Sequence, residues 1–160
     1  MSGAVERFVG AARALGIEPE VHRFPQGTKT AEDAARAVGC DVAQIVKSLV
    51  FLADGHPVLA LTSGANRVDV RKLAALAGAR EARRASPEEA RAATGYAVGG
   101  TPPIGHPTRL RTWIDRDLVA FDRVWAAAGA PDAVFPVDPR ELLRLGAVEA
   151  DLRTDGGAGR

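Results

Sequence analysis

Residues 44–52, QIVKSLVFL, constrain the fold more than any other stretch of this sequence. If they form a strand, their side chains alternate between two faces, and both faces are apolar. Such a strand is typical of a sheet that is covered on both sides. Asp54 and Gly55 follow, and residues 57–63, PVLALTS, form a second apolar run, which predicts a β-hairpin with a tight or slightly longer turn. One lysine, Lys47, interrupts the first strand.

Short helices are expected on both sides of this hairpin. Their signals are apolar residues at helical spacing combined with capping residues, such as Ser86 and Pro87 ahead of Glu89. The predicted helices cover residues 5–15, 30–39, 69–78, 86–95 and 138–146, and further strands are expected at 19–24, 111–115, 118–122, 123–127 and 133–137. Short helices interspersed with strands and hairpin turns predict an α/β domain with a mixed, largely antiparallel sheet.

A chain of 160 residues is long enough for one sizeable core and too short for two. We expect a single domain over residues 1–154 and a disordered tail over 155–160. The first residues lack the apolar core of a signal peptide, and no apolar run approaches a membrane span. A single cysteine, Cys40, excludes an internal disulfide framework and favours a reducing compartment. These features predict a soluble, cytoplasmic protein without a membrane partner.

The basic residues are unevenly divided between the two types. Of 21 lysines and arginines, only Lys29, Lys47 and Lys72 are lysines. Lysine is a compact donor whose pKa shifts readily on burial, whereas the guanidinium of arginine stays charged. Lys47 could therefore take part in catalysis. It could equally extend to solvent from a strand end, or serve as a charge that prevents an edge strand from pairing with another chain. Six basic residues between 67 and 84 form either a solvated face or a contact for a phosphate backbone.

Residues 99–107, GGTPPIGHP, contain three glycines and three prolines, which excludes a helix or a central strand. Glycines let a ligand approach the backbone closely, and prolines keep a loop rigid. Such a loop either connects two elements or presents N–H groups to a carbonyl oxygen or an oxyanion.

Several other site types lack their motif in this sequence. There is no Walker motif, no GxGxxG and no Gly-x-Ser-x-Gly elbow. His22, His56 and His106 do not share the spacing of metal ligands, and no metal or cofactor is expected. Cys40 is interpreted as a small buried apolar residue, and Thr30 as a helix cap.

The segments IVKSLVF, GHPVLALTSGANRVDVRKLA and TGYAVGGTPPIGHP, in this order, resemble the YbaK-type aminoacyl-tRNA deacylases. These are free-standing relatives of the editing domain inserted in bacterial prolyl-tRNA synthetases. The resemblance spans about residues 30–145. It implies a mixed sheet curled into an open barrel with flanking helices. It also implies hydrolysis of the ester that joins a mischarged small amino acid to a tRNA 3′ end, of the Cys-tRNA(Pro) or Ala-tRNA(Pro) type.

The resemblance also implies roles for individual residues. Lys47 falls on the signature lysine of the family, and Gly99 and Pro103 fall on its Gly-x-x-x-Pro loop. The implied catalytic residues are Lys47, Gly99 and Gly100: backbone amides would stabilise an oxyanion by ~3 kcal/mol per donor, and the ammonium would anchor the aminoacyl-adenosine. The nucleophile would be water or a group of the substrate. The residues predicted to bind substrate are Phe24, Val46, Ser48, Thr101, Pro103, Ile104, Gly105 and His106.

Two positions depart from the family pattern. Ala127 lies where the Cys-tRNA(Pro) branch commonly carries serine. The loop ends in GHP, which differs from many family members, and its His106 could either orient the substrate or close the loop. The alternatives to a deacylase are a noncatalytic module that binds tRNA ends or a protein, and a Schiff-base enzyme that uses Lys47. The presence of both Lys47 and the glycine loop favours the deacylase. Because the net charge is only +1, a partner synthetase could supply selectivity for the tRNA.

Overall fold

The predicted hairpin forms the centre of a five-stranded sheet. The computed structural model describes residues 3–25, 28 and 30–155. Strands β2 (Val46–Ala53) and β3 (His56–Ser63) pair in antiparallel register, with Lys47 opposite Thr62. Asp54 and Gly55 both have positive φ, 48° and 84°, as a tight hairpin turn with the right-handed twist of the strands requires.

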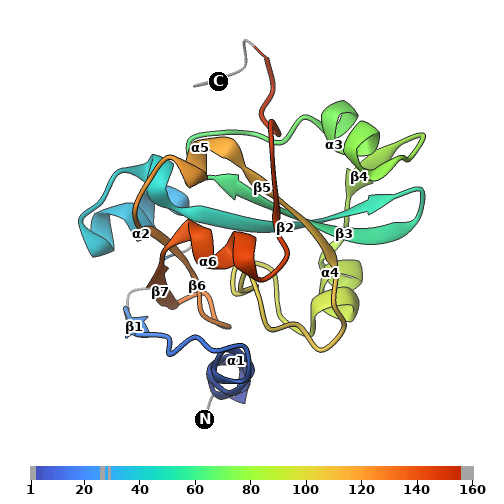
Figure 1. Cartoon of the computed structure of the whole chain (residues 1–160). Helices are drawn as coiled ribbons and strands as arrows, with labels where there is room; N and C mark the ends of the chain where they lie inside the picture. The colour runs from blue at the N-terminus through green and yellow to red at the C-terminus, as the bar shows by residue number, and fades with distance from the viewer. Residues whose placement is uncertain (1–2, 26–27, 29, 156–160) are drawn as a thin grey trace.

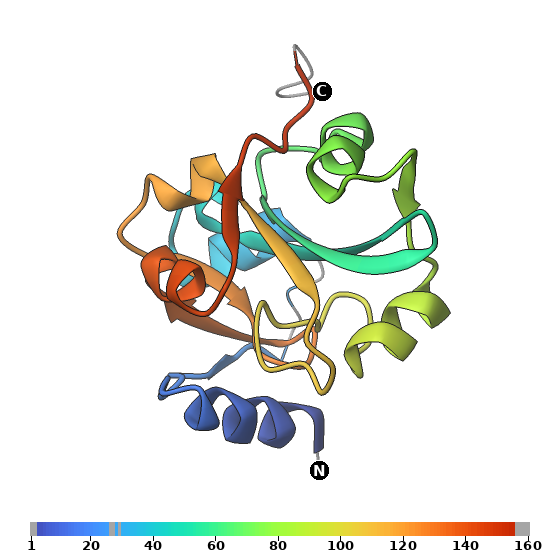
Figure 2. The ribbon, with the colours of Figure 1, turned by 45° about the vertical axis from the view of Figure 1, so that its right-hand side comes forward.

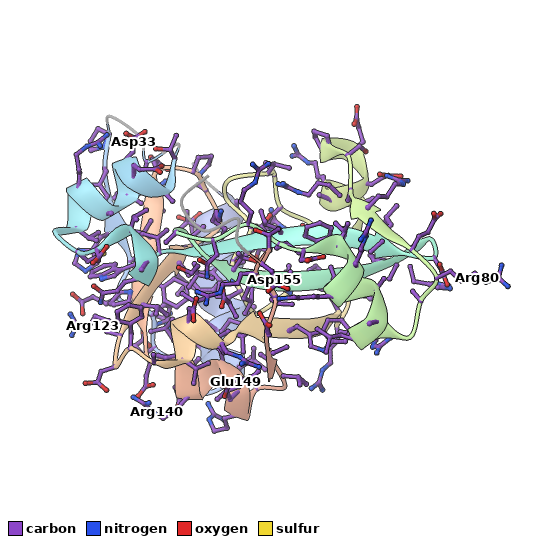
Figure 3. The ribbon with its side chains drawn as sticks, turned by 90° about the horizontal axis from the view of Figure 1, so that it is seen from above. Asp33, Arg80, Arg123, Arg140, Glu149 and Asp155 are labelled. Carbon is purple, nitrogen blue, oxygen red and sulfur yellow. The ribbon has the colours of Figure 1, made fainter. Side chains whose placement is uncertain are left out.

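The remaining strands of this sheet flank the hairpin. Strand β4 (Ala82–Arg84) pairs with the outer edge of β2, and β5 (Arg111–Asp115) runs parallel to β3. Strand β8 (Val148–Ala150) runs parallel to β5, which gives the order β4-β2-β3-β5-β8. Seen from above, Asp33 and Arg80 lie at opposite ends of the long central strands (Figure 3).

A second, antiparallel sheet has the order β1-β7-β6. Its strands are β1 (His22–Arg23), β6 (Val124–Ala127) and β7 (Ala133–Val137). One parallel bridge, from Ile45 to Trp125, connects it to the start of β2. The predicted α/β fold with a mixed sheet and flanking helices is confirmed, although the strands lie in two open sheets and do not close into a barrel.

The helices surround the two sheets (Figure 1). They are α1 (Gly3–Ala14), α2 (Ala31–Val38), α3 (Val70–Ala77), α4 (Pro87–Thr94), α5 (Arg116–Val119) and α6 (Pro139–Arg144), with a 3₁₀ turn, η1 (Val42–Gln44), before β2. Helix α1 runs along the three-stranded sheet, where Phe8 contacts Phe135 with ring centroids 4.8 Å apart (Figure 2). The capping boxes that begin α2 and α4 form at Thr30–Asp33 and Ser86–Glu89, as their sequences predict.

Strand β2 is covered on both faces, as its sequence predicts. Val46 and Val50 pack into the large core between the two sheets. Phe51 faces a second cluster, which includes Leu73 of α3 and Trp113 of β5. This arrangement places Lys47 on the face that is covered by α3.

One strand prediction fails, and another strand is shorter than predicted. Residues 118–122 form no strand, because Asp115 accepts a hydrogen bond from the Asp117 N–H and begins α5, which buries Leu118. The strand expected over 19–24 is reduced to His22–Arg23. Within the predicted tail, Asp155 pairs with Lys72 at 2.9 Å, and residues 156–160 lie outside the described part of the chain. Among the described helices, none is long and apolar enough to span a membrane.

Candidate functional site

A pocket of about 290 Å³ opens along the outer edge of β2. Strand β4 pairs with Phe51–Ala53, and the bridge between Ile45 and Trp125 joins the other sheet to the chain just before β2. Residues 46–50 between these points therefore border the pocket. Its other walls come from the start of α2, the loop after α4, and β6 and β7.

Five of the residues predicted to form the site line this pocket: Val46, Lys47, Ser48, Gly99 and Thr101. Residues 46–48 come from β2, and the other two come from the glycine–proline loop. The fold thus brings the two unusual stretches of the sequence to one cavity. The roles predicted for these residues remain predictions.

Lys47 is half-buried, and its ammonium is held by the backbone. Its Nζ donates a hydrogen bond to the Asn66 carbonyl oxygen at 2.7 Å. Burial lowers the pKa of Lys47, and the positive charges of Arg84 and Arg67 act in the same direction, whereas Glu32 and Asp115 oppose the shift. The ammonium therefore loses its proton more readily than that of an exposed lysine.

The two adjacent glycines of the loop differ in what they can offer a ligand. Gly99 has φ +89°, lines the pocket, and its N–H has no hydrogen-bond partner among the residues that the structure describes. Gly100 does not line the pocket, and its N–H donates to the Ala97 carbonyl at 3.0 Å. A Cβ at Gly100 would lie 2.8 Å from Ala130 Cα, so this glycine permits close backbone packing. The oxyanion donor predicted for Gly100 is thus already used inside the loop.

The second half of the loop faces elsewhere. Pro103, Ile104, Gly105 and His106 line a separate pocket of about 350 Å³. His106 Nε2 lies 2.8 Å from the Pro102 carbonyl oxygen; because a carbonyl only accepts, Nε2 carries the proton. Burial lowers the pKa of His106, and the bond to Pro102 opposes this shift. His106 therefore closes the loop as a neutral imidazole, away from Lys47.

Phe24, predicted as a pocket wall, does not line the pocket that contains Lys47. It packs against the cluster that contains Ile45, Trp125 and Val134, and those three residues do line it. Phe24 thus supports the wall from behind.

Arg84, one of the six basic residues between 67 and 84, also lines the pocket, and several other lining residues were missed by sequence reasoning: Thr28, Ala31, Ala34, Trp125, Pro131 and Val134. No motif marks them, since they belong to elements that only the tertiary fold brings together. Ala127, noted as a departure from the family pattern, also lines the pocket.

The pocket is apolar with a few polar groups and positive charge. Ser48 Oγ is buried and has no hydrogen-bond partner within the described residues, which leaves it available to a ligand. Lys47 and Arg84 are the charged residues among the described lining, which contains no carboxylate, histidine or cysteine. Of the basic residues between 67 and 84, Lys72 and Arg83 are ion-paired, to Asp151 and Glu89. The pocket is therefore suited to an anionic or polarised ligand with a small apolar group.

Comparison with known proteins identifies the family of this chain. The family model for the aminoacyl-tRNA editing domain matches residues 25–145. The uncharacterized protein YwhH of Bacillus subtilis (strain 168) is 32% identical over 126 residues, which are 78% of this chain and 80% of YwhH. EbsC of Enterococcus faecalis (strain ATCC 700802 / V583), named as a candidate Cys-tRNA(Pro)/Cys-tRNA(Cys) deacylase, is 27% identical over 72% of this chain and 71% of its own length.

A synthetase and a solved structure extend this comparison. The proline–tRNA ligase of Nitratidesulfovibrio vulgaris (strain DP4) is 36% identical over 145 residues, which are 89% of this chain but only 24% of the ligase. A crystal structure described as a candidate trans-editing enzyme for prolyl tRNA synthetase superimposes with a TM-score of 0.90 at 46% identity, over 96% of this chain and 99% of that one. The chain therefore belongs to the aminoacyl-tRNA editing domain family.

Proposed function

We propose that this protein is a single-domain trans-editing deacylase that hydrolyses the ester of a mischarged small amino acid on tRNA, of the Cys-tRNA(Pro) or Ala-tRNA(Pro) type. The observation that carries this proposal is the pocket shared by Lys47 and Gly99. Membership in the editing family supports an aminoacyl-tRNA substrate. The similarity to a proline–tRNA ligase and to EbsC supports tRNA(Pro) as its carrier.

The dimensions and lining of the pocket favour a small amino acid. Its volume, about 290 Å³, is near the lower limit for small-molecule sites. Ala34, Ala126, Ala127 and Val134 line it beside the indole of Trp125. A synthetase pocket separates amino acids that differ by one methylene by only ~1–3 kcal/mol, so a second, smaller site is useful for removing errors.

The polar groups of the pocket match the needs of ester hydrolysis. In the transition state the carbonyl oxygen becomes negative, and an unpaired backbone N–H such as that of Gly99 can donate to it. The Lys47 ammonium keeps two N–H donors beyond the one bound to Asn66, and these can hold the terminal ribose or steady the developing charge. Ser48 Oγ is the buried hydroxyl without a partner in the described lining, and it can orient water.

The source of the nucleophile follows from the residues around the pocket. No carboxylate, histidine or cysteine is found among its described lining residues. With Lys47 acting as a cationic donor, the described lining offers no general base, and we assign proton removal from the attacking water to the free amine of the substrate, which can pass the proton to the departing ribose oxygen. No covalent intermediate with the protein is needed.

A partner can supply selectivity for the tRNA body. The chain corresponds to about a quarter (24%) of the length of the proline–tRNA ligase. With a formal net charge of +1, its own attraction to RNA is weak. We therefore propose that a synthetase presents the tRNA. Equal deacylation rates on unrelated tRNA bodies, with and without prolyl-tRNA synthetase, would contradict this part.

The proposal is tested by amino-acid release from tRNA(Pro) charged in turn with Ala, Cys, Ser, Thr and Pro, with and without chelator. We expect rapid loss of one or two of the small amino acids, no loss of proline, and no effect of the chelator. A folded protein that hydrolyses none of the five esters but retains the charged tRNA would instead be a noncatalytic binding module. Reductive trapping of Lys47 by borohydride would indicate Schiff-base chemistry.

A further inference from the structure

Among the residues that the structure describes, the hydrogen-bond partner of the Lys47 ammonium belongs to the backbone of a turn. Its Nζ donates to the backbone carbonyl of Asn66 at 2.7 Å. This carbonyl lies in the turn that follows β3, where the Asn66 N–H donates to the Ser63 carbonyl at 3.0 Å and the Ala65 N–H donates to Ser63 Oγ at 3.2 Å. The position of this turn therefore decides where the ammonium lies.

A buried carboxylate holds this turn in place. Asp115, at the end of β5, is 1% exposed. Its Oδ2 accepts hydrogen bonds from the Ser63 N–H at 3.1 Å and from Asn66 Nδ2 at 2.8 Å, and its Oδ1 accepts from the Asp117 N–H at 2.9 Å. A buried charge is tolerated only with such partners. Asp115 thus binds both ends of the turn that holds Lys47.

A second carboxylate fixes the asparagine side chain. Asn66 Nδ2 also donates to Asp117 Oδ2 at 2.8 Å, and Asp117 pairs with Arg153 at 3.0 Å. Asn66 itself is only 6% exposed. An amide that joins two carboxylates has little freedom to rotate, so the Asn66 backbone is fixed as well.

The strand register places these groups in one row. Lys47 lies opposite Thr62, and Leu61 lies beside Ile114, so Asp115 follows on the far side of Thr62. All three side chains belong to the same face of the sheet because side chains alternate along each strand. Thr62 is fully buried, and its Oγ1 has no partner in the described structure. The row therefore places a cation on β2 and an anion on β5 on opposite sides of Thr62.

We propose that Asp115 and Asn66 are positioning residues for Lys47. Together they hold one of the three N–H donors of the ammonium, so that the other two face the pocket. This inference rests on the proposed function. A lysine on a flexible four-carbon chain otherwise distributes its donors over many rotamers. Misplacement of a reacting group by about 1 Å can cost on the order of 100-fold in rate. A positioning role therefore predicts a loss in kcat and little change in KM.

The chain allows a direct test, because only three lysines contribute signals when it is labelled with ¹³Cε-lysine. The pKa of Lys47 is read by NMR titration in wild type, Asp115→Asn and Asn66→Ala, with Lys47→Arg to assign the signal. The charged groups around Lys47 are Glu32 on α2, Arg84 on β4, Arg67 after β3 and Asp115 on β5. Asp115→Asn removes one of the two negative charges that raise the pKa of Lys47, so the titration of Lys47 should move to lower pH.

Asp151→Asn is the matched control, since Asp151 pairs with Lys72 at 2.8 Å. It should move the titration of Lys72 and leave that of Lys47 unchanged. In single-turnover deacylation, Asn66→Ala should lower the rate at saturating protein about 10-fold to 100-fold with the half-saturating concentration unchanged. If Asp115→Asn does not fold, Asn66→Ala decides the question by the same two readouts.

Unchanged Lys47 titration in Asp115→Asn, together with an unchanged rate in Asn66→Ala, would overturn the inference. If wild type hydrolyses no ester, the proposed function fails while the titrations still decide whether Asp115 governs Lys47. In that case, if neither Asp115→Asn nor Asn66→Ala changes the titration of Lys47 in folded protein, the positioning role of Asp115 and Asn66 is overturned as well.

Discussion

Lys47 on β2 and Gly99 in the loop after α4 line the same pocket, although a hairpin, α3, β4 and α4 separate them in the sequence. In the proposed mechanism the two residues act together: the Gly99 N–H donates to the carbonyl oxygen, and the Lys47 ammonium holds the terminal ribose or steadies the developing charge. Their meeting depends on the outer edge of β2, which β4 covers only at Phe51–Ala53. Residues 46–50 of this edge line the pocket in which we place the proposed substrate.

The two glycines of the loop should respond differently to substitution by alanine. Gly99→Ala places a Cβ 3.9 Å from Pro131, which is ordinary contact, but forces a residue with a side chain to φ +89°. Left-handed backbone costs roughly 1–2 kcal/mol, so we expect modest destabilisation and a loss of deacylation as the loop shifts. Thermal unfolding and single-turnover rates measure the two effects.

Gly100→Ala is the matched comparison. Its Cβ would lie only 2.8 Å from Ala130 Cα, so the backbone at one of these positions would have to shift to make room for it. We expect a larger loss of stability than for Gly99→Ala, measured by the same unfolding curves. A Gly100→Ala variant as stable as wild type would show that the loop does not pack as described.

His106 should contribute to stability and not to chemistry. Burial lowers the pKa of His106 in the folded state, so its neutral form is favoured there. The stabilisation is present above the unfolded pKa of about 6.5 and is lost as pH falls below that value. We expect His106→Ala to destabilise the fold at pH 7 by about 1 kcal/mol and to flatten the pH dependence of unfolding between neutral and mildly acidic pH. A loss of rate at full folding would instead place His106 in the chemistry.

The pH dependence of α4 should come from Glu89. Its hydrogen bonds with Arg83 and with the Ser86 N–H lower its pKa to about 2. Because the folded-state pKa is depressed, this stabilisation is present above the unfolded pKa of about 4.5 and is lost as pH falls from there toward 2. Glu89→Gln should therefore reduce the slope of stability against pH in this range. Glu88→Gln, on the same helix, serves as control, and equal slopes in both variants would refute the assignment.

Ala127 should influence the choice of amino acid. It lines the pocket and lies where the Cys-tRNA(Pro) branch commonly carries serine. Ala127→Ser adds a hydroxyl that can hydrogen-bond to the substrate. Because one hydrogen bond contributes about 1 kcal/mol, we expect the ratio of Cys-tRNA(Pro) to Ala-tRNA(Pro) hydrolysis to shift toward cysteine by roughly 10-fold. The ratio of the two single-turnover rates measures this, with Ala93→Ser outside the pocket lining as control. An unchanged ratio would show that the side chain at 127 does not contact the amino acid.

The local features of the fold could be predicted from the sequence because their causes are local. The turn at Asp54–Gly55 and the capping box at Ser86–Glu89 each depend on neighbouring residues, and both form. The strand expected at 118–122 fails because apolar residues there suit a short helix once Asp115 caps it.

The candidate site could be predicted only in part. Lys47 and Gly99 were marked by unusual composition, but Trp125 and Ala34 reach the pocket through tertiary contacts that no motif records. The glycine–proline loop reads as one unit in the sequence, yet its second half, with His106, turns to another cavity. Contacts such as Asp115 with Asn66 join residues far apart in the chain, which periodicity cannot reveal.

The central claim is that Lys47 acts in ester hydrolysis at this pocket. It is tested most directly by single-turnover deacylation of Ala-tRNA(Pro) and Cys-tRNA(Pro) with wild type, Lys47→Ala and Lys72→Ala, each shown to be folded. Lys72 is the matched control because its ammonium is paired with Asp151 and Asp155. We predict that Lys47→Ala reduces the rate at least about 100-fold on the preferred ester, in line with the loss of a positioned charged donor, while Lys72→Ala retains it. Equal rates in wild type and folded Lys47→Ala would contradict the account.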